Sequence, residues 1–237
     1  MGHVTALASV LMSQPSRVNQ LSITVIAKEC LPGNVKTRLT PPLEPAQGAA
    51  LAQSSLSQTL RTVRKLPAQQ RLLIFDGTPT SVDREGFTVV PQGSGGLDAR
   101  LAAICSAVTG PLLIVGMDTP QLDAAALQPL LSDWSGDSAE YDAWFGPADD
   151  GGFWALALAT PDPELILGVP MSSADTGRVQ LARLEAAGLT VGTLPALRDV
   201  DYFNDAQYVA SQCPGSEFAN YVEALNVEMA NSQGVNR

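Results

Sequence analysis

Cationic residues gather behind a glycine in the segment 32–39, which reads Pro-Gly-Asn-Val-Lys-Thr-Arg-Leu and follows the short apolar run 23–27. Backbone N–H groups in a glycine-containing loop can approach phosphate oxygens closely, and Lys28, Lys36 and Arg38 can supply positive charge from the same side. The segment lacks the GxxxxGK[ST] spacing of a Walker A loop. The pattern therefore predicts a site for an anionic ligand such as a triphosphate.

A second candidate is Asp118, which follows the uniformly apolar run 112–116. A run without polar residues is typical of a central strand covered on both faces. Open α/β sheets bind ligands in the crevice at the carboxyl ends of their strands, so this position favours a ligand-binding role. The alternative interpretation is that Asp118 caps a helix starting near Gln121.

Two further acids, Asp199 and Asp201, flank Val200 after an expected strand at 190–194. Alternation in an extended segment puts both carboxylates on one side. Magnesium prefers one or two carboxylates together with substrate phosphates and water, so Asp118 with Asp199 or Asp201 could hold a metal ion against a triphosphate. Capping of the following helix is an equally good interpretation of these acids.

The polar turn 149–152, Asp-Asp-Gly-Gly, lies between two apolar runs. Asp-Gly is a common hairpin signal, which by itself favours a tight connection. The functional alternative is that the paired glycines let the main chain approach a sugar or phosphate while the acids bind hydroxyls or a cation. Trp154 follows this turn, but tryptophans at such positions, like Trp134 and Trp144, are more typical of core packing than of base stacking.

Short β-rich runs alternate along the chain with longer stretches in which apolar residues recur at i, i+3 and i+4. This alternation predicts an α/β fold with a mainly parallel sheet. We expect strands at 21–27, 71–75, 88–91, 112–116, 141–145, 152–158 and 190–194. We expect helices at 45–65, 97–108, 123–134 and 173–187, and another that begins near residue 204.

The composition limits the classes of function. The chain has 237 residues, of which 45% are hydrophobic, and this suits one large domain, expected at 21–215 between a flexible segment 1–20 and a helix with a frayed tail at 216–237. A net charge of −10 argues against a nucleic-acid partner. Three cysteines and one histidine, far apart, argue against a disulfide framework or a zinc site.

We expect a cytoplasmic protein without a membrane partner. The first twenty residues lack the basic segment and the long apolar core of a secretory signal. No apolar run reaches the roughly 18 residues that a membrane span needs. The sequence leaves the formation of a homodimer open.

The order of the motifs resembles the DUF2064 family of GT-A-like nucleotidyltransferase and glycosyltransferase proteins, which is related to molybdopterin guanylyltransferase and 2-phospho-L-lactate guanylyltransferase. The resemblance spans roughly residues 22–210. Two positions depart from the family pattern: Gly96 stands where an acid is usual, and Met171 stands where tryptophan is common. The motifs that carry the resemblance are Ala27-Lys28 with the loop 32–39, then 92–101, 116–120, 146–154 and 199–201.

The resemblance implies a Rossmann-like three-layer α/β/α sandwich and a site that uses Mg²⁺ or Mn²⁺. It makes Lys36, Arg38 and Asp118 catalytic, and it assigns the metal to Asp118 with Asp201 or, as second choice, Asp199. The acceptor would face Asp150, Gly151, Gly152 and Trp154. The nucleotide would be bound by Ala27, Lys28, Pro32, Gly33, Lys36, Thr37, Arg38, Gln92 and Arg100.

The implied reaction is the transfer of a nucleoside monophosphate from a nucleoside triphosphate to a small phosphorylated or hydroxylated acceptor, with release of pyrophosphate. One alternative is glycosyl transfer from a nucleotide-diphospho-sugar, and another is a regulatory protein that binds nucleotide without turnover. Three cations near one loop favour a triphosphate, because a diphosphate sugar carries less charge to offset.

Overall fold

The computed structural model describes residues 16–136 and 138–234. The predicted flexible segment 1–20 lies mostly outside these residues, and its described end forms a short 3₁₀ helix at Arg17–Gln20. None of the helices within the described ranges is long and apolar enough to cross a membrane.

The described residues form one seven-stranded sheet with the order β3-β2-β1-β4-β6-β5-β7. Neighbouring strands are parallel except at β6, which runs antiparallel to both β4 and β5. The mainly parallel sheet predicted from the sequence is therefore confirmed. The strands are β1 (Ser22–Lys28), β2 (Gln70–Asp76), β3 (Thr88–Pro91), β4 (Leu112–Val115), β5 (Ala143–Pro147), β6 (Phe153–Leu158) and β7 (Val191–Thr193).

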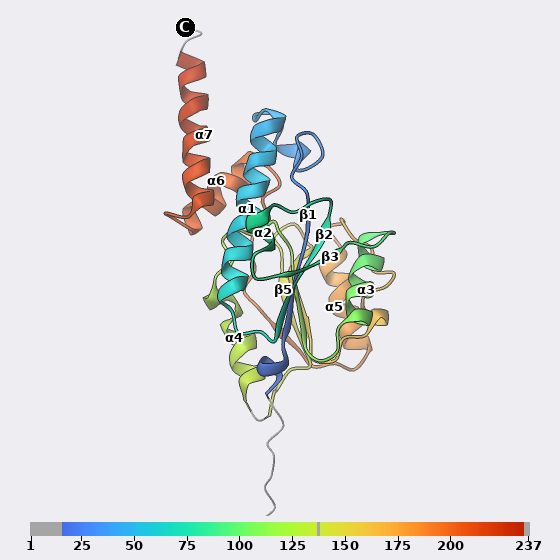
Figure 1. Ribbon diagram of the computed structural model, residues 1–237. Coiled ribbons are helices and arrows are strands. Elements are labelled where there is room, and N and C mark those ends of the chain that lie inside the picture. The colour runs from blue at the N-terminus through green and yellow to red at the C-terminus, as the bar shows by residue number, and fades with distance from the viewer. Residues whose placement is uncertain (1–15, 137, 235–237) are drawn as a thin grey trace, which may run out of the picture.

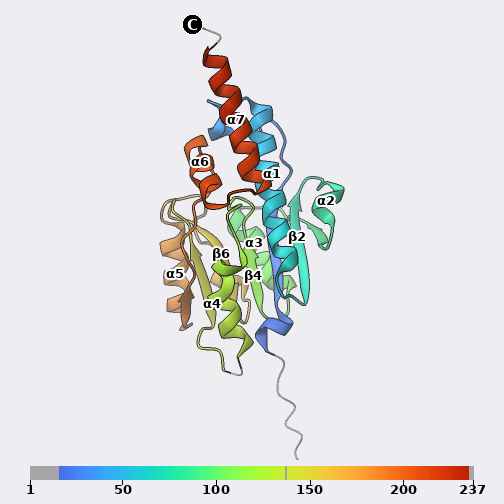
Figure 2. The same cartoon turned by 90° about the vertical axis from the view of Figure 1, so that its left-hand side faces the viewer.

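Helices cover both faces of this sheet and give the three-layer arrangement (Figure 1). The apolar sides of α1 and α4 pack on one face around buried residues such as Leu60 and Leu127. Figure 2 views the sheet from that side. The opposite face is covered by α3 and α5 through Ile104 and Leu184. These helices are α1 (Pro45–Lys65), α3 (Leu97–Ala107), α4 (Ala124–Ser135) and α5 (Thr176–Ala186).

Two C-terminal helices, α6 (Phe203–Gln212) and α7 (Glu217–Gly234), form a cap beside the N-terminal half of α1 (Figures 1 and 2). Their buried side chains, including Phe203 and Phe218, form a separate apolar cluster with Leu39 and Val200. The cap thus holds together the cationic loop and the segment that carries Asp199 and Asp201.

Local sequence explains where the elements begin and end. Pro45 starts α1, and the Gln47 side chain accepts a hydrogen bond from the Glu44 backbone N–H at 2.9 Å, as in a capping box. Helix α4 begins at Ala124 rather than near Gln121, because the Asp123 side chain caps it through the Ala126 N–H at 2.8 Å. The short helix α2 (Ser81–Arg84) was not predicted, because its four residues are too few to show a helical period.

Candidate functional site

A cavity of about 940 Å³ opens at the carboxyl ends of β1 and β4 and beside the turn between β5 and β6. Acidic side chains outnumber cationic ones in its lining. Of the residues predicted for the site, the lining includes Ala27, Lys28, Arg38, Gln92, Arg100, Asp118, Asp150, Gly152, Trp154, Asp199 and Asp201.

The centre of the site is a charge cluster formed by Lys36, Arg38, Asp118 and Asp201. The Lys36 Nζ lies 3.1 Å from Asp118 Oδ2 and 3.0 Å from Asp201 Oδ1. The Arg38 guanidinium donates to the other oxygen of Asp201 at 2.9 Å. The structure therefore brings together the cationic loop and two of the acidic motifs, whose residues are separated by up to 165 positions in the chain.

The backbone fixes the positions from which these side chains reach one another. Lys36 has a φ of 48°, in the left-handed region, and its carbonyl accepts a hydrogen bond from the Leu39 N–H at 3.0 Å. The Val200 N–H donates to the Asp118 carbonyl at 3.1 Å and ties the segment of the last two acids to the end of β4. Burial of Leu39 and Val200 in the cluster under the cap secures both segments.

Burial and neighbouring charge set the ionisation of the cluster. Although burial opposes its charge, the Asp118 and Asp201 carboxylates raise the pKa of Lys36. Burial also opposes the charge of Asp201, but Lys36 and Arg38 hold the pKa of that carboxyl below its ordinary value. Burial together with the nearby charges of Asp118 and Asp150 raises the pKa of Asp199 to about 7. The surroundings thus favour the charged forms of Lys36 and Asp201 and disfavour the charged form of Asp199.

The helix-capping alternatives for the acids fail in the structure. Asp123 caps α4, so Asp118 is not used there. At α6 the Tyr202 N–H donates to Asp205 Oδ2 at 2.8 Å, while Asp201 is paired with the two cations. These acids therefore have no structural task at a helix terminus.

The acidic residues present suit a hard divalent cation. Asp118 Oδ1 is buried and has no hydrogen-bond partner, so it is available to accept from a ligand or coordinate a cation. Within the described ranges, no group of three or more acidic, cysteine or histidine side chains is already arranged to hold a metal ion. One or two carboxylates completed by phosphate oxygens and water are the coordination that Mg²⁺ prefers. Asp118 and Asp201 fit that requirement.

At the other end of the cavity, Gln92 and Arg100 are linked to each other. The Gln92 side chain donates to the Ala27 carbonyl at 2.7 Å and accepts from Arg100 Nη1 at 2.8 Å. Arg100 Nη1 also lies 3.5 Å from Asp76 Oδ2. Both functional atoms of the Gln92 amide are engaged within the protein, which orients the Arg100 guanidinium at the cavity wall.

Four residues predicted to bind nucleotide lie outside the lining. Pro32, Gly33 and Thr37 are exposed on the loop and do not contribute to the cavity wall. Lys36 is also outside the lining, but its ammonium pairs with Asp118 and Asp201, two carboxylates that line the cavity. Within the loop, Lys36 and Arg38 therefore reach the acids of the site, while Pro32, Gly33 and Thr37 stay exposed.

The turn 149–152 is a hairpin connection between β5 and β6, in which the Gly151 N–H donates to the Ala148 carbonyl at 3.1 Å. Gly151 has a φ of +88°, and a Cβ there would lie 2.1 Å from the Ala174 carbonyl oxygen. Close approach of the chain before α5 therefore explains this glycine, while Asp150 and Gly152 face the cavity. Trp154 is buried and donates to the Pro195 carbonyl at 3.0 Å, so its indole is a packing element of the cavity wall.

Several residues of the lining were not predicted from the sequence. Asp76 ends β2 at the same edge of the sheet as Asp118, and its place directly after an apolar run was a usable signal. Arg198 directly precedes the last acidic motif, lies 3.1 Å from Asp149 Oδ2 and packs on the ring of Tyr208. Tyr202 directly follows that motif, and its ring lies 6.0 Å from the Arg38 guanidinium. No pattern in the sequence marks a role for either of the last two.

This fold, with a charged cavity at the carboxyl edge of a mainly parallel sheet, is GT-A-like. A solved structure from Desulfovibrio desulfuricans G20, described as a "putative nucleotide-diphospho-sugar transferase", matches at 23% identity and a TM-score of 0.75, covering 91% of this chain and 96% of that one. A cytidylyltransferase from Leptospira borgpetersenii matches at 13% identity and a TM-score of 0.52, with coverages of 89% and 95%.

CMP:2-keto-3-deoxy-manno-octonic acid synthetase, solved in complex with CTP, matches at 13% identity and a TM-score of 0.52, with coverages of 80% and 96%. The comparison with curated proteins gave no match. The model of the family described as "Uncharacterized protein conserved in bacteria (DUF2064)" matches residues 59–173. This match confirms the resemblance to DUF2064 predicted from the motifs.

Proposed function

We propose that this protein is a divalent-metal-dependent nucleotidyltransferase that moves a nucleoside monophosphate from a nucleoside triphosphate to a small acceptor and releases pyrophosphate. The observation that carries the proposal is the convergence of Lys36, Asp118 and Asp201 at the carboxyl end of the central strand β4. This is the edge at which open α/β sheets bind their ligands. The adjoining cavity, at about 940 Å³, is large enough for a nucleotide and a small acceptor.

The charges of the site support a polyphosphate with a bound cation. Lys36 and Arg38 would neutralise charge that develops on departing pyrophosphate, and Arg38 is already exposed toward the cavity. Asp118 and Asp201 would hold Mg²⁺ or Mn²⁺, which supplies Lewis-acid stabilisation of the phosphate oxygens. Asp150 and Gly152, at the hairpin end of the cavity, would face the acceptor.

Two of the structurally similar proteins support the proposed class of reaction. One is a cytidylyltransferase and another is a synthetase solved with CTP. Both are remote in sequence, so they support the transferase class through the fold and leave the nucleobase and acceptor to experiment.

Glycosyl transfer from a nucleotide-diphospho-sugar is the second candidate. It is favoured by the match to the Desulfovibrio structure, which has the highest TM-score of the three matches described here. The same cationic loop and carboxylates would serve either reaction, because both generate a leaving group that carries phosphate charge.

The test is a thermal-shift panel of the four nucleoside triphosphates and common UDP-, GDP- and CDP-sugars, each with and without Mg²⁺. Stabilisation by one triphosphate that depends on Mg²⁺, followed by pyrophosphate release with an acceptor, would support nucleotidyl transfer. Stabilisation by one nucleotide sugar with release of a nucleoside diphosphate would establish glycosyl transfer instead. Binding without turnover across an acceptor library would indicate the regulatory alternative, and no binding would refute the proposal.

The Asp118→Asn variant is the control for the panel. It keeps the size of the side chain but removes the charge that pairs with Lys36. We expect it to lose the Mg²⁺-dependent part of the stabilisation while its unfolding temperature without ligand stays close to that of the wild type.

A further inference from the structure

Lys36 occupies an unusual position for a residue expected to bind phosphate. Its side chain is only 10% exposed, and its Nζ bridges carboxylates from two separate elements, Asp118 after β4 and Asp201 before α6. Both distances are those of direct charged hydrogen bonds. The ammonium is therefore turned inward, onto the acids, rather than outward into the cavity.

The oxygens that Lys36 engages belong to the carboxylates best suited to hold a divalent cation. A carboxylate oxygen that accepts from an ammonium at 3.0–3.1 Å is a poorer metal ligand, because coordination would bring two positive charges together. Asp118 Oδ1, which has no partner, is the one oxygen of that carboxylate left available.

We propose that Lys36 is the internal counter-ion of the metal site and keeps it closed until a polyphosphate draws the ammonium away. Cation and nucleotide would then bind together rather than independently. This inference rests on the proposed function, since it takes the polyphosphate as the ligand that competes with the two carboxylates for Lys36.

The surroundings of Lys36 allow such an exchange. Arg38 holds the second oxygen of Asp201 at 2.9 Å, so this carboxylate keeps a cationic partner after Lys36 departs. The backbone of Lys36 is held by the Leu39 hydrogen bond and by the buried side chains of Val35 and Leu39. The flexible stem of the lysine can therefore turn while the loop stays in place.

Two consequences can be measured without any turnover. The ligand-free protein should bind a divalent cation weakly, and a bound nucleotide should raise its affinity for the cation. By thermodynamic linkage the cation must raise the affinity for the nucleotide by the same factor.

The experiment titrates Mn²⁺ alone into the full chain and follows free Mn²⁺ by electron paramagnetic resonance, with no nucleotide present. Lys36→Met keeps the length of the side chain and removes its charge, so we expect Mn²⁺ to bind about tenfold or more tightly than to the wild type. Lys28→Met is the matched control, because Lys28 lines the same cavity and has no ion pair with Asp118 or Asp201. It should change Mn²⁺ affinity far less.

Lys36→Met combined with Asp118→Asn should lose the gained affinity, which places the bound ion on that carboxylate. Equal or weaker Mn²⁺ binding by Lys36→Met, with a circular dichroism spectrum like that of the wild type, would overturn the inference. If removal of the lysine unfolds the chain, the inference is tested instead by the Mn²⁺ affinity of the wild type with and without a bound nucleotide. Mn²⁺ affinity that is unchanged by a bound nucleotide would contradict the proposed closure.

Failure of this inference and failure of the proposed function give different results. A wild type that binds Mg²⁺-nucleotide in the thermal panel, with no gain of Mn²⁺ affinity in Lys36→Met, would retain the function and reject the closure. A gain of Mn²⁺ affinity in Lys36→Met, without nucleotide binding by the wild type, would retain a metal site and reject nucleotide transfer.

Discussion

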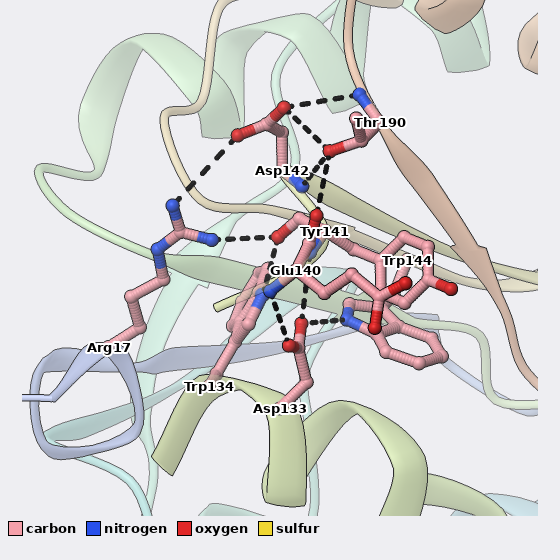
Figure 3. A network of polar contacts seen from close by, with 8 residues as sticks. All are labelled: Arg17, Asp133, Trp134, Glu140, Tyr141, Asp142, Trp144 and Thr190. Carbon is pink, nitrogen blue, oxygen red and sulfur yellow. Dashed lines mark hydrogen bonds and ion pairs between the residues drawn. The ribbon is translucent and has the colours of Figure 1, made fainter. Parts of the chain in front are cut away.

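Polar networks lie at both ends of the sheet, and they differ in how completely the protein satisfies them. The network at the amino ends of β1, β5 and β7 surrounds Asp133 and Asp142 (Figure 3). Asp133 accepts from the Glu140 N–H at 2.6 Å and from the Trp144 indole at 3.1 Å. At the carboxyl edge, by contrast, Asp118 has a buried oxygen without a partner.

One carboxyl group from each network shows opposite shifts of its pKa, Asp142 at the amino edge and Asp199 at the carboxyl edge. The backbone and hydroxyl of Thr190 donate to Asp142 and hold its pKa below the ordinary value. Burial and neighbouring acids raise the pKa of Asp199. Where carboxylates meet fixed donors, they stabilise the fold; where they meet other carboxylates, they weaken it. Residues at a functional site commonly break the local rules that the rest of the fold obeys.

The largest effect should come from Asp118→Asn. It removes one carboxylate from the proposed cation site, and we expect catalysis to fall about 100-fold or more while the chain stays folded. Product formation and thermal unfolding are measured together. Asp149→Asn is the matched control, since this acid lines the same cavity but pairs with Arg198. Equal losses of activity in both variants would mean that catalysis depends only on the total charge of the cavity and not on Asp118 in particular.

At the opposite edge, Asp133→Ala should destabilise the protein without changing activity per folded molecule. It removes the acceptor of the Glu140 and Tyr141 N–H groups and of the Trp144 indole. We expect a loss of about 1–3 kcal/mol in the free energy of unfolding, measured by urea denaturation. Ser132→Ala, one position earlier on α4, is the control and should change little. A drop in activity of the Asp133→Ala variant under conditions where it is fully folded would show that the amino and carboxyl edges of the sheet are coupled.

Asp199→Asn should have the opposite effect on stability. The wild-type carboxylate is partly buried near Asp118 and Asp150, and an amide of the same shape carries no charge to desolvate or repel. At pH 8 we expect the free energy of unfolding to rise by about 1 kcal/mol while activity falls, as is common for functional residues. Destabilisation measured by urea denaturation would instead assign Asp199 a structural role.

The smallest effect concerns the pH dependence contributed by Asp142. Its pKa lies below the ordinary 3.8 in the folded protein, so it stabilises the fold above that value and loses this contribution as the pH falls through the lower, folded pKa. Asp142→Asn should be less stable than the wild type at pH 6, by about 1 kcal/mol or less because the side chain is partly exposed. This difference in stability between the variant and the wild type should disappear at low pH, where the Asp142 carboxylate is protonated. A gap that persists at low pH would exclude the carboxylate charge as its cause.

The long helices, the strands and the motifs at their ends could be predicted from the order of the residues. Short β-rich runs indicated the strands, and the recurrence of apolar residues at i, i+3 and i+4 indicated the long helices, because a helix that buries one face requires that spacing. The position of Asp118 after an apolar run indicated the ligand-binding edge. Helix α2 was not predicted, because its four residues complete only one turn and show no repeating pattern.

The pairing of the charges, by contrast, could not be predicted before the chain was folded. The contact of Lys36 with Asp201 joins residues 165 positions apart, and no local pattern encodes which acid the ammonium meets. The sequence left open whether Gly151 serves a tight turn or the approach of a ligand, and only the folded chain shows that the neighbouring backbone of Ala174 leaves no room for a Cβ there. Burial, charge and close packing depend on segments brought together by the sheet, so the properties of the site emerge only when the chain is folded.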